Sequence, residues 1–284
     1  MSEDAGLFGP ESVTWKLHRE PVLLLGGLRS LYLQALHPRA VAAIAQNSGY
    51  RADPWGRLMR TSNYVATVVY GTAAEVEQAG SRLRRLHSRM TAVDPRTGEK
   101  FRIDEPDLLR WVHVTEVESF LTTATRAGLR LTPDEIDRYY TEQLQAAELV
   151  GLDPATVPST AAEVAAYYEA IRPELGLTRD SAETAFFLTV PPVPENWGNK
   201  ALRLGLTLGP TRWAYFGIAA TAIGLLPPWA RRLYGGPGWP TTDFSADLSV
   251  RGIRLLIASV LATLPSRYQA SAVRQAALDR TGAA

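Results

Sequence analysis

Apolar residues recur along this chain at the three- and four-residue spacing of amphipathic helices, and no sustained alternation typical of strands accompanies them. Thr72, Thr132 and Thr160 are each followed three residues later by Glu, which predicts a capping box and a helix start at each position. Asp53-Pro54 predicts another start, because proline fits the first helical position. The pattern predicts an all-α protein, a single multi-helix domain of about ten helices.

The expected helices cover most of the chain. Gly26-Gly27 is expected to interrupt the second of them, and His37-Pro38 to end it, because the residue before proline disfavours helical geometry. We expect a polar, turn-rich connection at 94–102 and proline- or glycine-rich loops at 189–198 and 235–240. The expected helices are 10–19, 21–36, 39–48, 55–70, 72–90, 106–128, 133–151, 161–172 and 181–188, with others from 200, from 210 and, as a pair, from about 243.

Composition narrows the possible chemistry. With 284 residues, 46% of them hydrophobic, the chain can bury a sizeable core, and its net charge of +1 gives no field that attracts nucleic acid. Cysteine is absent, which excludes disulfides, thiolate-ligated haem, thiolate zinc, iron–sulfur clusters, cysteine nucleophiles and covalent c-type haem. The N-terminus shows no secretory signal, so the expected location is cytoplasmic.

The most apolar stretch is 213–229, and it is shorter than the ~20 residues that a bilayer span needs. Pro227-Pro228 ends it. We therefore expect no transmembrane segment. A buried core helix is the first interpretation of this stretch, and a lipid-facing or substrate-channel helix is the alternative.

Two consecutive helices carry the main candidate site. Arg57, Thr61 and Tyr64 share a face of the first helix, at i, i+4 and i+7, and His87 is the one titratable group on the apolar face of the second. A cation, a hydroxyl and an imidazole converging on an apolar interior suggest a buried charged cofactor. Arg60, near Arg57, is either a hydrogen-bond donor to dioxygen or a surface cation.

Each of these residues has two interpretations. His87 is either a core histidine or an axial iron ligand, with neutral Nε2 on the metal and Nδ1–H donated to a carbonyl near Leu83. Arg57 is either solvated or paired with a haem propionate, whose carboxylate suits a bidentate guanidinium.

A third helix adds His113 and Glu116, which lie on one apolar stripe and at a spacing that allows a mutual hydrogen bond. They form either a buried polar pair or part of the site, with His113 as an alternative axial ligand. His37, before a proline, is expected to be structural, and nothing around His18 makes it a candidate.

Several catalytic and cofactor motifs are missing. The chain has no His-Glu-x-x-His, no Glu-x-x-His, no Gly-x-Ser-x-Gly, no Walker loop and no dinucleotide fingerprint. These absences favour a ready-made prosthetic group over chemistry from side chains alone.

The sequence resembles the catalytic domain shared by rubber oxygenases (latex-clearing proteins) and MpaB-type oxygenases, over roughly residues 20 to 235. The motifs that carry the resemblance are Arg-x-x-x-Thr on one helix, a histidine in an Arg/Leu-rich helix about thirty residues later, and then Trp-Val-His. They lie in the runs ALHPRAVAAIA, YRADPWGRLMRTSNYVATVVYGT, RLRRLHSRM, DEPDLLRWVHVTEVESFL and DRYYTEQ.

The resemblance implies a globin-like helical core that holds non-covalent haem b. It implies that His87 is the proximal iron ligand, that Arg57 and Thr61 are pocket residues, and that Arg60 stands where rubber oxygenases carry a distal lysine. Tyr64 and His113 are further cofactor-binding candidates. Such enzymes cleave a carbon–carbon double bond with dioxygen. Rubber oxygenases also use an acidic pocket residue upstream of the Arg-x-x-x-Thr motif, and here no acidic residue occurs between Glu20 and Asp53.

The expected organisation is an N-terminal arm (1–19), an oxygenase-like helical domain (20–235) and C-terminal helices (236–284) packed on the same domain. The expected function is a haem b-dependent oxygenase acting on a hydrophobic alkene, isoprenoid or lipid-like, with dioxygen as its other partner. The alternatives are a non-catalytic haem protein such as a sensor, and a non-haem all-α protein, including a di-iron bundle that uses His87, His113 and Glu116.

Overall fold

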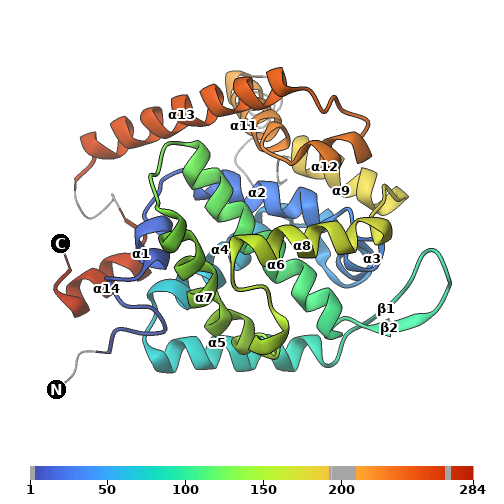
Figure 1. The fold of residues 1–284 in the computed structure, drawn as a ribbon, viewed down its shortest axis with the longest axis horizontal. Helices are drawn as coiled ribbons and strands as arrows, with labels where there is room; N and C mark the ends of the chain where they lie inside the picture. The colour runs from blue at the N-terminus through green and yellow to red at the C-terminus, as the bar shows by residue number, and fades with distance from the viewer. Residues whose placement is uncertain (1–3, 192, 194–208, 266–269, 284) are drawn as a thin grey trace.

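The computed structural model describes residues 4–191, 193, 209–265 and 270–283. In these residues the chain forms thirteen α-helices and one two-stranded sheet (Figure 1), so the all-α prediction is confirmed. The helices are α1 (Val13–His18), α2 (Leu23–Gln34), α3 (Pro38–Asn47), α4 (Pro54–Tyr70), α5 (Ala73–His87), α6 (Pro106–Arg126), α7 (Pro133–Leu149), α8 (Ala161–Ile171), α9 (Arg179–Thr189), α11 (Pro210–Gly224), α12 (Pro228–Leu233), α13 (Pro240–Thr263) and α14 (Ala272–Thr281).

Local capping chemistry sets the helix starts as predicted. The Asp53 carboxylate accepts a hydrogen bond from the Gly56 amide at 2.8 Å, which caps α4. Both bonds of the capping box form at Thr72, before α5, and at Thr132, before α7. These bonds join residues three apart, which is why sequence alone locates them. The third predicted box, before α8, forms only in part: the Thr160 hydroxyl accepts from the Glu163 amide, but the Glu163 carboxylate accepts from the Ser159 amide instead.

Three expectations about the elements were wrong. Residues 94–102 are not only a turn, because β1 (Thr91–Val93) and β2 (Lys100–Arg102) pair antiparallel across this region. Three residues are too few to show an alternating pattern. Helix α5 ends at His87 rather than at residue 90. Helix α2 continues through Gly26-Gly27 without interruption. The loop at 189–198 lies mostly outside the described residues, and the helix expected from 200 begins outside them.

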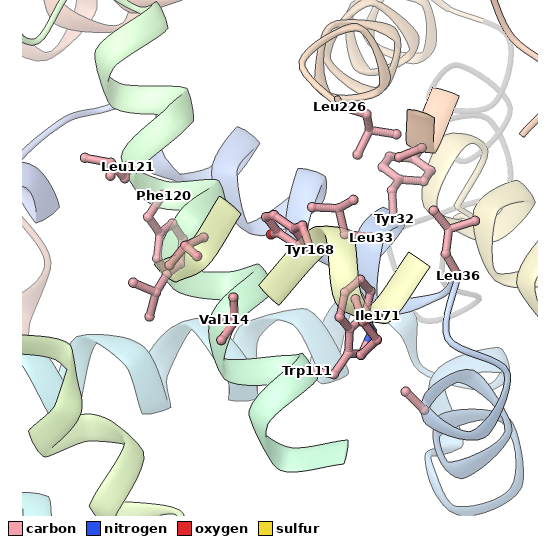
Figure 2. Close-up of a cluster of buried hydrophobic side chains, with 14 of the residues drawn as sticks. Tyr32, Leu33, Leu36, Trp111, Val114, Phe120, Leu121, Tyr168, Ile171 and Leu226 are labelled. Carbon is pink, nitrogen blue, oxygen red and sulfur yellow. The ribbon is translucent and has the colours of Figure 1, made fainter. Parts of the chain in front are cut away.

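The core is centred on the crossing of α2 and α6. Figure 2 shows side chains from both helices meeting those of α8 and Leu226 in one apolar cluster. A Cβ on Gly26 would lie 2.9 Å from the Phe120 ring and 3.2 Å from the Ser119 carbonyl oxygen. Glycine at this position therefore lets the two helix backbones approach closely, which explains the pair of glycines inside α2.

A buried ion pair joins the same two helices. Arg29, 2% exposed, donates to both Glu118 carboxylate oxygens, at 2.5 and 3.0 Å, and also to the Ser119 hydroxyl and the Leu225 carbonyl. The Tyr168 hydroxyl donates to Glu118 at 3.1 Å. Burial opposes ionisation of Glu118, but Arg29 outweighs it, so the pKa of this carboxyl lies below its usual value.

Helices α11 and α12 pack against one side of this core, through Ala219, Ala222 and Ala230. Helix α11 buries Ala219 and Ala222 completely, whereas Trp213 and Phe216 are 73% and 46% exposed. The buried-helix interpretation of 213–229 is therefore right for its second part and wrong for its first. Among the described helices, none is long and apolar enough to cross a bilayer.

We predict opposite effects for alanine at the two glycines of α2. Gly26→Ala forces a methyl group into Phe120 and is expected to lower the unfolding free energy by about 1–3 kcal/mol. Gly27→Ala meets only the edge of that ring, at 3.9 Å, and is expected to raise it by about 0.5–1 kcal/mol through helix propensity. Chemical denaturation followed by circular dichroism measures both variants. Equal effects would contradict the close-approach argument.

Candidate functional site

Helices α4 and α5 bring Arg57 and His87 together. The chain turns at Gly71, between the two helices, and both residues lie about four helical turns from it. The positive charge of Arg57 lowers the pKa of His87, so it acts on this imidazole from the preceding helix. The sequence-predicted cation and imidazole therefore share one region of the interior.

Arg57 is a partly buried cation without a counter-ion. Its guanidinium donates to the Thr61 hydroxyl, and that hydroxyl in turn donates to the Arg57 carbonyl at 3.1 Å. Burial and the nearby Arg60 lower the pKa of Arg57, while Glu116 opposes this. No ion pair to Arg57 forms within the described part of the chain. Arg57 and Thr61 thus share a helix face as predicted and also contact each other, while the positive charge has no carboxylate partner in the described part of the chain.

His87 is the last residue of α5, and its Nδ1 is buried without a hydrogen-bond partner. Burial, and then Arg57, lowers the pKa of His87, with Asp104 opposing. The imidazole is therefore neutral at neutral pH, which is the form that binds metals. The expected bond from Nδ1 to a carbonyl near Leu83 is not formed.

Tyr64 and Glu116 are two further polar residues near Arg57. The Tyr64 hydroxyl is buried without a partner, and burial raises the pKa of Tyr64 to about 12. Glu116 reaches this region from α6. Burial raises the pKa of Glu116 to about 7, and Arg57 counteracts part of that effect. Arg57, Tyr64, His87 and Glu116, with Thr61, form what we call the α4–α6 polar cluster.

Arg60 lies apart from the cluster. Its side chain is 64% exposed and pairs with Asp53 at 3.3 Å on the protein surface. The sequence allowed two interpretations of Arg60, a donor to dioxygen or a surface cation. In this structure its side chain lies on the surface. Its role as a donor to dioxygen stays a prediction.

His113 faces a different space from that of His87. It lines a cavity of about 10 Å³ between α6, α7 and α8, together with Val117, Tyr140 and Val164, and burial lowers its pKa to about 4. No hydrogen bond between His113 and Glu116 is present in the described structure, although their spacing allowed one. The two candidate histidines are therefore separated, and Arg57 acts on His87.

The other two histidines have structural surroundings. The His37 Nδ1 accepts a hydrogen bond from the Ala40 amide at 3.3 Å and caps α3, as expected for a structural residue. The His18 ring packs edge-on against Phe120, with 5.1 Å between ring centroids. Across residues 4–191, 193, 209–265 and 270–283, no three His, Asp or Glu side chains gather in a way that could hold a metal ion.

The sequence offered Glu116 as part of the site but did not predict that it acts on residues of α4. The spacing of His113 and Glu116 suggested a pair within one helix, whereas the carboxyl of Glu116 instead interacts electrostatically with Arg57 and Tyr64 on α4. The two helices are about fifty residues apart in sequence, and no local pattern links positions at that separation.

The raised pKa of Glu116 predicts a pH dependence of stability. The folded state holds this proton more tightly than the unfolded state, so the stabilisation is complete below pH 4.5 and lost as the pH rises through about 7. Because Glu116 is only partly buried, the expected loss is discounted to about 2 kcal/mol. The Glu116→Gln side chain cannot ionise, so this variant should not show the fall in unfolding free energy with rising pH that Glu116 causes. Measuring the unfolding free energy of both proteins between pH 4.5 and about 7 tests this prediction. Parallel dependences on pH in the two proteins would contradict it.

Comparison with known proteins gives one match. Residues 15–258 match the family described as ER-bound oxygenase mpaB/B′/rubber oxygenase, catalytic domain. No curated protein and no solved structure matches the chain. The matched region contains every residue of the α4–α6 polar cluster and most of the helical body. The chain therefore belongs to the mpaB/rubber oxygenase catalytic-domain family.

Proposed function

We propose that this protein is a haem b-dependent oxygenase that acts on a hydrophobic alkene, isoprenoid or lipid-like. The observation that carries the proposal is a set of unsatisfied polar groups in one place: Arg57 without a counter-ion, and His87 Nδ1 and the Tyr64 hydroxyl buried without partners. Buried polar groups in folded proteins are nearly always satisfied, so such a cluster calls for a ligand. Family membership supplies the oxygenase class.

Haem b fits the chemistry of these groups. A neutral imidazole at His87 is a suitable ligand for iron, and a guanidinium at Arg57 is a suitable partner for a propionate carboxylate. Thr61 fixes the Arg57 side chain through its hydroxyl, which keeps the guanidinium oriented before any anion arrives. The haem, when bound, supplies the activation of dioxygen. We further propose that α4, α5, α6 and α7 form the globin-like core that encloses it.

Residues of this chain would have three roles beside a bound haem. His87 and Arg57 hold it, and the Tyr64 hydroxyl can donate a hydrogen bond within the pocket. Glu116, whose pKa is about 7, can hold or release a proton at its carboxyl oxygens near neutral pH. Glu116 thus places an ionisable acid in the pocket from α6, although the chain between Glu20 and Asp53 provides none.

The first prediction concerns haem binding. Protein expressed with added haem precursor should show a Soret absorption band, and His87→Gly should lose or strongly shift it. Added imidazole should restore the band in His87→Gly, which separates lost ligation from misfolding. His113→Ala is the matched control and should keep the band. Absence of a Soret band in the unmodified protein would refute the haem proposal. Loss of the band in His113→Ala alone would mean that His113, and not His87, is the iron ligand.

A second prediction compares the two arginines of α4. Arg57→Gln removes the interior cation and is expected to weaken haem binding by about tenfold or more, the effect of losing a charge-assisted bond of roughly 1.5–3 kcal/mol. Arg60→Gln removes a surface cation and should leave haem affinity unchanged. Haem titration followed by absorbance measures both. Equal losses would show that Arg57 has no special contact with the cofactor.

The third prediction concerns the reaction. Haem-loaded protein should convert an isoprenoid alkene into carbonyl products under air, and should not do so under argon. Isotopically labelled dioxygen should appear in the product, with the His87→Gly variant as the inactive control. A haem-loaded protein that leaves all tested alkenes unchanged would instead favour the non-catalytic haem-binding function.

A further inference from the structure

Helix α13 carries a long apolar surface that faces solvent. Figure 1 shows this helix along the upper edge of the molecule, as the outermost element on that side. Large apolar side chains on it, and just before it, are between 52% and 74% exposed. They are Trp239, Phe244, Leu248, Leu255, Leu256 and Val260, which we call the α13 surface.

Only a narrow strip of α13 contributes to the core. Ala246 and Val250 are buried against Val22, Leu25 and Leu225. Beyond them, residues 255–264 contain no ionisable side chain, and eight of these ten residues are Leu, Ile, Val or Ala. A solvent-facing helix normally carries polar residues on its outer side, and one that is apolar on all sides is normally buried. An exposed patch of this kind marks an interaction site.

The charges near the α13 surface suit a negatively charged partner. Both acidic residues of the helix are neutralised by arginines of neighbouring helices: Asp243 pairs with Arg231 and Asp247 with Arg126. Arg251 is exposed, and its Nε donates to a backbone carbonyl, so its charge is not cancelled by a carboxylate in the described part of the chain. The helix therefore presents apolar side chains next to an uncompensated positive charge.

The type of apolar residue points to lipid rather than to a second copy of the chain. A helix pair between two copies would cover one stripe of α13, whereas the exposed apolar residues at 255, 256, 258, 260 and 262 leave the helix in several directions, and only Ser259 and Thr263 are polar in this segment. Trp239 stands at the start of the helix, and tryptophan is enriched where an apolar phase meets water. Since the helix does not meet the requirements of a membrane span, it would lie in the plane of the interface.

We propose that the α13 surface docks this protein onto an anionic lipid bilayer, with α13 lying at the boundary between headgroups and acyl chains. Leu248, Leu255 and Leu256 would enter the acyl region, and Arg251 would remain among the headgroups. The proposal does not depend on haem or on the reaction. It would place the protein beside the phase in which hydrophobic alkenes dissolve.

Vesicle flotation tests the docking directly. The full-length protein should bind vesicles of phosphatidylcholine with about 30% phosphatidylglycerol, and bind more weakly to phosphatidylcholine alone or at high salt. The triple variant Leu248→Gln/Leu255→Gln/Leu256→Gln should lose at least tenfold in partitioning. Leu86→Gln is the matched control: it removes a leucine that is 49% exposed on α5, the helix along the opposite edge of the molecule in Figure 1, and should change nothing.

A site-specific probe locates the contact. Because the chain has no cysteine, Leu255→Cys creates a single labelling site for an environment-sensitive fluorophore. Its emission should shift to the blue when anionic vesicles are added, whereas the same label at Leu86→Cys should not respond.

Four outcomes would overturn the proposal. Absence of vesicle binding would do so, and so would equal binding of the triple variant. Light scattering that shows a dimer, converted to a monomer by the triple variant, would make α13 an interface between copies. A fall in thermal stability of the triple variant, without vesicle binding by the unmodified protein, would mean that another segment of the chain covers the surface.

Discussion

The buried ion pair between Arg29 and Glu118 sets the arrangement on which the rest of the fold depends. It joins α2 to α6, the two helices at the centre of the core, and Gly26 permits the approach that the pair requires. A buried charge is tolerated only when it is paired and its remaining hydrogen-bonding groups are satisfied. Here Ser119, Leu225 and Tyr168 complete the network, so α6 has one rotation and one depth relative to α2.

The rotation of α6 relative to α2 also determines which side chains of α6 face the candidate site. Glu116 and Glu118 are two residues apart on α6, so their side chains leave the helix on nearly opposite sides. With Glu118 bound to Arg29 on α2, Glu116 is turned toward Arg57 and Tyr64 on α4. The same rotation directs His113 to the cavity beside α7 and α8. The position of the candidate acid in the α4–α6 polar cluster is thus a consequence of core packing.

Two regions of this protein hold groups whose surroundings do not match their polarity. In the α4–α6 polar cluster, polar groups are removed from water without partners. On α13, apolar groups remain in water without cover. Both arrangements cost free energy in the isolated chain, and both are relieved by a partner of matching character. A charged prosthetic group suits the first, and a lipid surface suits the second.

Local sequence patterns were enough to predict the helical class, most helix starts, and Arg57, Thr61, Tyr64 and His87 as candidates. These follow from bonds and periodicities that span three to seven residues, such as the Thr72 capping box and the Arg57–Thr61 contact. The role of Gly26 and the small sheet at 91–102 were not predicted, because each depends on a partner strand or helix.

Contacts between groups far apart in the sequence became visible in the folded protein alone. The tertiary structure paired Arg29 with Glu118, turned Glu116 toward Arg57, separated His113 from His87 and left the outer face of α13 in solvent. Periodicity assigns a residue to a face of its helix. The partner of that face is set by how whole helices pack, and this packing is fixed by contacts between residues far apart in the chain.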